Sequence, residues 1–561
     1  MTKSLQVDVA IVGGGPSGST LGTLLKKYDP NLQVAIIEKE KFPRDHVGES
    51  LLPAVTTILA EMGVWDKVEA ANFPIKLGAT YRWGSTDDHW NLSFIGESDF
   101  TETERPGKFE SQRTKTAFQV DRSQYDEILL EHAREAGCLV CMESEVRDVK
   151  GANGLINHLV VREKGGNEFE LKAKYTVDAS GEAGVLRRAL QIPIESPTAL
   201  RNIAFWDYWQ HAEWPERFSG VATRIQIMSL GWGWLWFIPI TDTRTSVGLV
   251  LPAQYYKKTG QRPLELYLEA IQSEPHISSL LQSATREENF STTKDWNFLS
   301  RQLCGENWFL VGDSCGFADP ILSAGLTLAQ TSARKVAYSI LELFRGQLPP
   351  DWIKKEYNEG HRIQILHHMR FADFWYAGNG CFSDLKEFCT TLAADVGLNL
   401  KADDAFAWLS TGGFALDRPG FAGAVGFPLS GLQLVAEHLT GGEVRSALEG
   451  CNCVTANLAG ATQAPYAIYE NGRIIQAASY VRGDVTLPRI ALFELLLSAA
   501  VKPVHVDQWL AACYHFGKHI GSEMGNFANY TQAAEALVRE GWLTPSYNPS
   551  MQRATTFAKQ S

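Results

Sequence analysis

A glycine-rich motif close to the N-terminus restricts the fold of this chain more than any other feature. Gly13, Gly15 and Gly18 form the pattern G-x-G-x-x-G. A predicted strand at residues 7–12 precedes the motif, and a predicted helix at residues 16–28 follows it. Because glycines lack side chains, the backbone N–H groups of such a turn can approach a pyrophosphate at the positive N-terminus of the helix. The motif therefore predicts the start of a doubly wound α/β domain that binds a dinucleotide.

The acidic residue that completes this motif is Glu38. It ends a second predicted strand about 20 residues after the last glycine, where its carboxylate can accept hydrogen bonds from the ribose hydroxyls of an adenosine. Ser17, inside the glycine motif, is a further candidate for cofactor binding. The strand, helix, strand and terminal acid together favour FAD or NAD over a fortuitous turn.

Composition limits the classes of partner. The net charge of −12 argues against a nucleic-acid or anionic-membrane surface, since both need clustered Lys and Arg. No run approaches the roughly 20 apolar residues of a membrane helix, so no membrane span is expected. Cys138 and Cys141 are spaced as C-x-x-C but lack a second pair, so no metal site is expected. The N-terminal residues lead directly into the first predicted strand, which favours a cytoplasmic location.

The predicted elements divide the chain at about residue 350. We expect a doubly wound, dinucleotide-binding α/β region at residues 1–350 and a mainly helical C-terminal domain at residues 351–561, with a hairpin turning at Asn471 and Gly472. Within the first region, the nucleotide-binding parts are expected at about 1–75, 110–195 and 296–350, and a substrate-covering β-sheet at about 76–109 and 196–295.

Three later segments resemble FAD-binding segments of flavin monooxygenase-like proteins. Arg122 stands in V-D-R, Asp178 stands in V-D-A-S-G, and Gly312-Asp313 is followed by an Asp-Pro pair that contains Pro320. NAD dehydrogenases lack this ordered set. The resemblance therefore implies FAD, with these five residues among its binding residues.

Two further segments resemble FAD-dependent halogenases in particular. The run P-R-D-H-V-G-E-S-L-L-P, which contains Arg44 and Ser50, is similar to the segment at the edge of the flavin. The run G-W-L-W-F-I-P, which contains Trp234 and Trp236, matches the W-x-W-x-I-P pattern of that family at each specified position. The resemblance implies that Arg44 and Ser50 contact the cofactor.

The two tryptophans are spaced so that they can form a wall between the flavin and an organic substrate. Trp234 and Trp236 fall on one face of a strand, where two indoles can keep an organic substrate away from the flavin. The resemblance implies that the oxidant then meets a small halide first, and that hypohalous acid travels onward. Lys76, in F-P-I-K-L-G-A, stands where the family carries its catalytic lysine. An ammonium there can hydrogen-bond hypohalous acid, and a neutral amine can form a haloamine.

The run P-I-L-S-A-G resembles the family's turn beside the flavin ring. Its small residues expose backbone amides that can hold a halide, so Ser323, Ala324 and Gly325 are halide candidates and Gly325 is also a cofactor candidate. An alternative reading makes Ser323 simply the N-cap of the following helix, and both readings can hold together. Leu322 stands where tryptophan halogenases carry a glutamate. The resemblance therefore favours the branch that acts on phenols, pyrroles or activated carbonyl compounds over the tryptophan halogenases.

The predicted function is that of a FADH2-dependent halogenase in natural-product biosynthesis. Its cofactors are FAD, chloride or bromide, and O2, and a separate flavin reductase is the expected partner. The substrate is a small molecule, free or tethered to a carrier protein. Two alternatives share the nucleotide motifs. One is an FAD-dependent hydroxylase or a flavin-dependent reductase, and the other is a non-catalytic flavoprotein that binds a carrier protein.

Overall fold

The computed structural model describes residues 3–83, 88–95, 100–101, 104–152, 154–198, 200–294, 296–377, 446–483, 485–489, 491–519 and 527–557. The described chain falls into two compact units. The first comprises residues 3–375 and 469–474, and the second comprises residues 446–468 and 475–557. Among the described residues no helix is long and apolar enough to cross a membrane, and no group of His, Cys, Asp or Glu side chains could hold a metal ion.

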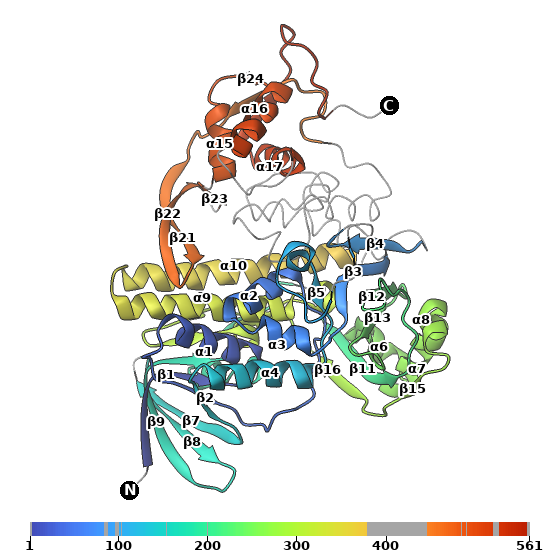
Figure 1. The fold of residues 1–561 in the computed structure, drawn as a ribbon, viewed down its shortest axis with the longest axis vertical. Coiled ribbons are helices and arrows are strands. Elements are labelled where there is room, and N and C mark those ends of the chain that lie inside the picture. The colour runs from blue at the N-terminus through green and yellow to red at the C-terminus, as the bar shows by residue number, and fades with distance from the viewer. Residues whose placement is uncertain are drawn as a thin grey trace. The chain divides into compact units, whose positions relative to one another are not determined.

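The first unit contains a seven-stranded sheet in the order β6-β2-β1-β9-β8-β7, with β18 beside β9. Five of these strands, β1, β2, β7, β8 and β9, are labelled in Figure 1. Its strands are β1 (Lys3–Val12), β2 (Val34–Ile37), β6 (Leu139–Cys141), β7 (Ser144–Ala152), β8 (Leu155–Glu163), β9 (Glu168–Asp178) and β18 (Trp308–Leu310). β1 runs parallel to both β2 and β9, while β7, β8 and β9 are antiparallel neighbours. The predicted strand, helix and strand around the glycine motif are therefore confirmed.

Helices cover this sheet. They are α1 (Pro16–Tyr28), α2 (Pro53–Met62), α3 (Trp65–Ala70), α4 (Arg122–Glu135), α5 (Val185–Ala189), α9 (Gly325–Arg345) and α10 (Pro350–Ala377). α1 packs against α4 and α9. A small sheet of β10 (Ile194–Glu195), β17 (Phe298–Ser300) and β19 (Gly316–Phe317) lies at the edge of this layer.

The first unit extends beyond the predicted boundary at residue 350. α10 begins at that boundary but belongs to the first unit as far as Trp375. Its Tyr357 is buried, donates a hydrogen bond to the carbonyl oxygen of Leu310 at 2.5 Å, and packs on Phe309 with ring centroids 5.9 Å apart. The apolar side of α10 is thus part of the core of the first unit.

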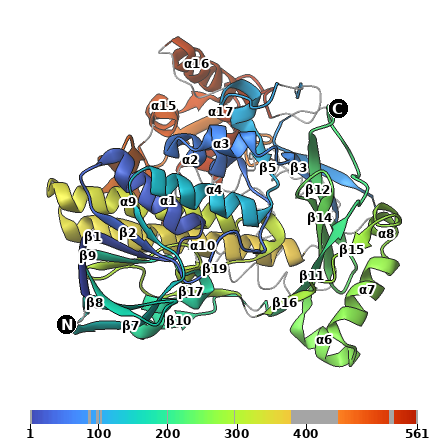
Figure 2. The ribbon, with the colours of Figure 1, turned by 60° about the horizontal axis from the view of Figure 1, so that its bottom comes forward.

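A nine-stranded sheet forms the second layer of this unit, in the order β15-β11-β14-β13-β12-β3-β4, with β16 beside β11 and β5 beside β3. Its strands are β3 (Ile75–Arg82), β4 (Trp90–Ser93), β5 (Ala117–Phe118), β11 (Asn202–Gln210), β12 (Ala222–Ser229), β13 (Trp234–Pro239), β14 (Arg244–Pro252), β15 (Thr285–Arg286) and β16 (Ser291–Lys294). One face packs on α6 (Ala253–Thr259), α7 (Pro263–Ser273) and α8 (Pro275–Leu280), as Figure 2 shows. The opposite face of the sheet carries Trp234 and Trp236 and borders a cavity.

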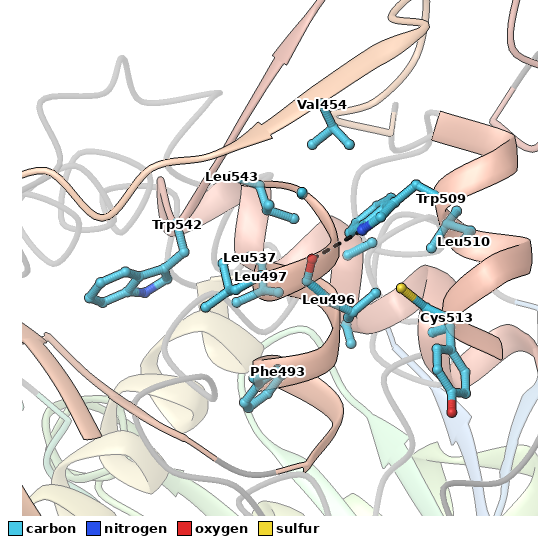
Figure 3. Close-up of a cluster of buried hydrophobic side chains, with 14 of the residues drawn as sticks. Val454, Phe493, Leu496, Leu497, Trp509, Leu510, Cys513, Leu537, Trp542 and Leu543 are labelled. Atoms are coloured by element: carbon cyan, nitrogen blue, oxygen red, sulfur yellow. Dashed lines mark hydrogen bonds between the residues drawn. The ribbon is translucent and has the colours of Figure 1, made fainter. Parts of the chain in front are cut away.

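The second unit has a hydrophobic core of its own. Trp509 is buried there and donates a hydrogen bond from its indole to the carbonyl oxygen of Leu496 at 3.0 Å (Figure 3). Its elements are β20 (Cys453–Ala456), β21 (Thr462–Glu470) as far as Ile468, β22 (Arg473–Arg482) from Ile475 onward, β23 (Val485–Pro488), α15 (Ala491–Ala499), β24 (Val504–His505), α16 (Val506–His519), α17 (Phe527–Arg539) and β25 (Leu543–Ser546). The prediction of a mainly helical domain also covers residues 378–445, which lie outside the described residues.

The predicted hairpin is confirmed. β21 and β22 are joined by Asn471 and Gly472, whose φ angles are +47° and +72°. Two consecutive residues with positive φ give the turn whose twist matches that of paired strands, and Asn-Gly is the dipeptide that favours it.

Candidate active site

The first unit contains a cavity of about 830 Å3. Its wall includes most of the residues that the motifs single out: Gly13, Gly15, Ser17, Glu38, Arg44, Ser50, Arg122, Trp234, Trp236, Asp313, Pro320, Ser323 and Gly325. Segments separated by some 300 residues in sequence therefore meet around one space. Five predicted residues stand just outside the wall: Gly18, Lys76, Asp178, Gly312 and Ala324.

The glycine motif forms a cradle that side chains would fill. Gly13 has φ +109°, and a Cβ there would lie 2.3 Å from the carbonyl oxygen of Ala179. A Cβ on Gly18 would lie 2.0 Å from the carbonyl oxygen of Gly13. Both distances are far below van der Waals contact, so the turn requires glycine at these positions. The wall that results is backbone, as a pyrophosphate site needs.

Glu38 is held at the end of β2 by backbone hydrogen bonds. Its Oε2 accepts from the N–H of Gly14 at 2.7 Å, and its Oε1 accepts from the N–H of Glu40 at 2.8 Å. The side chain is buried and borders the cavity. A carboxylate has about four acceptor positions, so lone pairs remain for the hydroxyls of a ribose.

Arg122 and Arg44 share one buried carboxylate, that of Asp126. Arg122 donates to both carboxylate oxygens, from Nε at 2.7 Å and from Nη2 at 2.9 Å, and Arg44 Nη2 lies 3.5 Å from Oδ2. Arg122 Nη1 also donates to the carbonyl oxygens of Val47 and Gly48. Arg44 Nη1 is buried and has no hydrogen-bond partner among the described residues. Two guanidinium groups against one carboxylate leave a positive charge beside the cavity, which fits an anionic cofactor.

Two residues predicted to bind the cofactor, Asp178 and Gly312, do not line the cavity but hold residues near its wall in place. The Asp178 carboxylate accepts from the Ser180 hydroxyl and from the backbone N–H groups of Ser180, Leu186 and Arg187, so it fixes the start of α5. Burial raises the pKa of Asp178. At Gly312 a Cβ would lie 2.4 Å from the Ser17 hydroxyl oxygen, so this glycine allows close packing.

Asp313 is the acidic residue of this motif that faces the cavity. Burial raises its pKa to about 6. With a pKa of about 6 the carboxylate is mostly ionised at pH 7, where it can accept hydrogen bonds from a hydroxyl-rich ligand.

A shift in strand register determines the direction of Lys76. Along the β3–β12 pair, Thr223 stands opposite Lys76 but Arg224 stands opposite Gly78, so Leu77 is an extra residue in β3. Side chains alternate along a strand, and an extra residue changes the alternation. Lys76 therefore shares a face with Thr223 and, through Ile227, with Trp236. A Cβ on Gly78 would lie 2.0 Å from the carbonyl oxygen of Leu92, so glycine is required at this irregularity.

The amine of Lys76 is buried against two serines of the cavity wall. Nζ donates to the Ser50 hydroxyl at 2.7 Å, to the carbonyl oxygen of Leu51 at 3.1 Å and to the Ser323 hydroxyl at 3.5 Å. It also lies 5.3 Å from the ring centre of Phe94. The described residues show no salt bridge to it, and burial lowers the pKa of Lys76 to about 7. A substantial fraction of the amine is thus neutral near pH 7.

The two tryptophans of β13 stand side by side in the wall. The ring centroids of Trp234 and Trp236 are 6.0 Å apart, and both rings are buried. Trp236 Nε1 donates to the Ser246 hydroxyl at 3.0 Å, which fixes its ring. Gly248 stands opposite Trp236 in β14, and a Cβ there would lie 2.1 Å from the indole.

The turn before α9 excludes the alternative reading of Ser323. α9 begins at Gly325 with Ala324 as its N-cap and without a side-chain cap, so Ser323 does not cap this helix. Ser323 instead has φ +57°, and its hydroxyl donates to the Ser50 hydroxyl at 3.0 Å. The N-terminus of α9 still borders the cavity through Gly325, where the helix dipole favours an anion.

The cavity wall also contains an acid that the motifs do not single out, Glu49, which is held by a tyrosine. Glu49 is buried in the wall, accepts from the Tyr208 hydroxyl at 3.0 Å and from the N–H of Gly48 at 3.0 Å, and burial raises its pKa. Tyr208 stacks on the guanidinium of Arg244 at 3.9 Å. Glu49 lies within the segment identified at the flavin edge and could have been found. Tyr208 is 159 residues away and has no local signal.

The chain matches a protein family over most of its length. Residues 6–366 match the family described as FAD binding domain. The glycine cradle, the acceptor at Glu38 and the unpartnered buried nitrogen of Arg44 agree with that cofactor, and the cavity is of the size that cofactor sites have.

Curated relatives and a solved structure give the narrower relationship. The chain is 34% identical over 390 residues to a 1H-pyrrole-2-carbonyl-[peptidyl-carrier protein] chlorinase of Pseudomonas fluorescens, a match that covers 67% of this chain and 85% of the relative. It is 33% identical over 344 residues to a tryptophan 2-halogenase of Chondromyces crocatus, covering 61% and 62%. The fold resembles that of the flavin-dependent halogenase CmlS, with a TM-score of 0.72, 23% identity and coverage of 99% and 98%. The chain therefore belongs to the FAD binding domain family and, within it, to the flavin-dependent halogenases.

Proposed function

We propose that this halogenase transfers halogen to an electron-rich aromatic or activated-carbonyl substrate by way of Lys76. The observation that carries the proposal is the Lys76 amine, which is buried, has its pKa lowered to about 7, and touches two serines of the cofactor cavity. An amine without a salt bridge among the described residues is a nucleophile rather than a structural cation. Chloride or bromide enters as the co-substrate, at the N-terminus of α9.

FADH2, supplied by a separate reductase, together with O2 and halide provides hypohalous acid when the cofactor is bound. The neutral Lys76 amine attacks the halogen, so an N–X bond forms, the X–O bond breaks, and water leaves. An aromatic carbon then takes the halogen from nitrogen, and the proton lost by that carbon restores the amine. The wall formed by Trp234 and Trp236 keeps the organic substrate outside the cofactor cavity while this occurs.

Aromatic side chains on the Lys76 face support a planar substrate. Tyr81 and Trp90 are stacked with centroids 4.9 Å apart, and Trp375 lies 5.0 Å from Tyr81. Leu322 offers no carboxylate to stabilise a cationic indole intermediate. Phenols and pyrroles can lose a proton as halogenation proceeds, so they depend less on such a group. The chlorinase relative adds the option that the substrate is tethered to a carrier protein.

The rate of halogenation should rise with pH through about 7. The reactive form is the neutral amine, and burial lowers the pKa of Lys76 to about 7, so its neutral fraction increases as pH passes that value. The expected profile has an acid limb with a midpoint near pH 7 in single-turnover experiments with pre-reduced FAD. A rate that is flat from about pH 6 to pH 9 would contradict a neutral amine as nucleophile.

Gly248→Ala should uncouple flavin oxidation from halogenation. The new methyl group would lie 2.1 Å from the Trp236 indole, so the ring must leave its position in the wall. We expect the fraction of reduced flavin that yields halogenated product to fall by about tenfold, with more hydrogen peroxide released. Gly165→Ala is the matched control, because its Cβ would meet only an atom 4.0 Å away. Unchanged coupling in G248A would show that Trp236 is not part of a working wall.

The proposal is tested by mass spectrometry of reactions containing the protein, FAD, a flavin reductase, NADH, O2 and bromide. The panel comprises phenols, pyrroles, free tryptophan and a carrier-protein-bound pyrrole. Bromine incorporation into phenols or pyrroles, and not into free tryptophan, is the expected result. Bromination of free tryptophan alone would overturn the proposed substrate class, and oxygen insertion without bromide would overturn the chemistry.

A further inference from the structure

Ser50 differs from the other residues of the flavin-edge segment because its hydroxyl contacts the Lys76 amine. Lys76 Nζ lies 2.7 Å from Ser50 Oγ, the shortest of its three hydrogen bonds, and Ser323 Oγ lies 3.0 Å from Ser50 Oγ. Ser50 and Ser323 border the cavity, whereas Lys76 does not. The Ser50 hydroxyl is thus the link between the amine and the cavity.

The backbone fixes this link on both sides. Ser50 forms an isolated antiparallel bridge with Gln119, and Lys76 pairs with Ala117 two residues earlier in the same segment. Only 8% of the surface of Ser50 and 2% of that of Lys76 are exposed. Ser50 is held by this bridge and Lys76 by its pairing in β3, so the 2.7 Å contact joins two backbone positions that pair with the same segment, residues 117–119.

The Ser50 hydroxyl can form a hydrogen bond with the Lys76 amine in both of the amine's charge states. The Ser50 oxygen can accept a hydrogen bond from the ammonium, and its proton can be donated to the lone pair of the neutral amine. The carbonyl oxygen of Leu51 can only accept, so it cannot serve the lone pair in this way. Ser50 can therefore hold Nζ in one place in both protonation states.

We propose that Ser50 is a positioning residue for Lys76, holding its amine toward the cavity before and after the amine loses a proton. The inference rests on the proposed role of Lys76, and it gives Ser50 a task other than cofactor binding. Ser323 supports the same arrangement by donating to Ser50, so the three residues form one chain from the amine to the cavity wall.

The test measures Lys76 directly, in FAD-free protein. Trace labelling with acetic anhydride at pH values from about 5 to 9, followed by peptide mass spectrometry, gives the midpoint at which Lys76 becomes nucleophilic. The variants are S50A, the hydroxyl-retaining S50T and, as control, S339A. Ser339 is also a buried serine, but its hydroxyl donates to the carbonyl oxygen of Lys335 within α9.

S50A removes an acceptor from the ammonium, so the labelling midpoint should fall by about one pH unit. The midpoint in S50T and S339A should remain within about 0.3 unit of the wild type. FAD affinity, measured by fluorescence titration, should change by less than about threefold in S50A. Halogenation by S50A should be at least about tenfold slower at saturating substrate, with little change in KM.

An unchanged midpoint in S50A would overturn the inference, as would labelling that is undetectable at Lys76 in all variants. A large loss of FAD affinity in S50A with normal labelling of Lys76 would show that Ser50 binds the cofactor and does not position Lys76. Failure of the proposed function has a different signature: wild-type protein would then halogenate independently of Lys76, whatever the labelling shows.

Discussion

Replacing Lys76 with methionine is expected to slow halogenation by about a thousandfold or more while the protein still binds FAD. Methionine fills a similar volume in this buried position but has no nitrogen to receive the halogen. The cofactor cavity keeps its wall, because the Lys76 side chain is not part of it. The measurement is product formation with pre-reduced FAD and bromide, together with fluorescence titration of FAD.

The matched control for K76M is Lys355→Met on α10, whose side chain is 64% exposed. It should retain full activity. K76R tests the nature of the nitrogen: a guanidinium stays charged at pH 7, so it should be as inactive as methionine if a neutral amine is required. Halogenation by K76M at more than about a tenth of the wild-type rate would exclude Lys76 as the halogen carrier.

Replacing Arg122 with methionine is expected to lower the free energy of unfolding of the first unit by about 3 to 5 kcal/mol. The change leaves the fully buried Asp126 without its two-pronged partner, and Arg44 at 3.5 Å cannot replace both hydrogen bonds. It also removes the hydrogen bonds that hold Val47 and Gly48 beside the cavity, so FAD affinity should fall as well. Urea unfolding of the FAD-free protein separates the two effects.

Two further variants show whether the lost stability comes from the stranded carboxylate. Adding Asp126→Asn to R122M should recover part of the loss, because the buried charge is removed. Arg147→Met, which breaks a half-exposed pair with Glu145, should cost less than about 1 kcal/mol. If R122M cost no more than R147M, the Arg122–Asp126 pair would not organise this part of the cavity.

Much of the fold could be predicted because its signals are local. The helix predicted at residues 16–28 is α1, and the strand predicted at residues 7–12 lies within β1 at Lys3–Val12. The turn at Asn471 and Gly472 could be predicted in the same way, because few dipeptides favour two consecutive positive φ angles. Each of these signals depends on neighbouring residues, so no tertiary information was needed.

The arrangement of the site could be predicted only in part. The motifs identify residues that meet at one cavity, but they do not separate the wall from its supports, as Asp178 and Gly312 illustrate. The Glu49–Tyr208 contact joins residues far apart in sequence. The alternative of Ser323 as a helix cap follows from the usual role of a serine before a helix, whereas in this turn Ser323 has a positive φ and its hydroxyl donates to Ser50.

The extra residue in β3 also bears on how lysine-containing relatives should be compared. Regular alternation back from Tyr81, without this irregularity, would put Leu77 and Ile75 on the tryptophan face and Lys76 on the side of α6–α8. The irregularity between Lys76 and Gly78 therefore decides whether the amine lies on the tryptophan face. In an alignment, a side chain at position 78, which would clash with the carbonyl oxygen of Leu92, bears on halogenating capacity even where the lysine is retained.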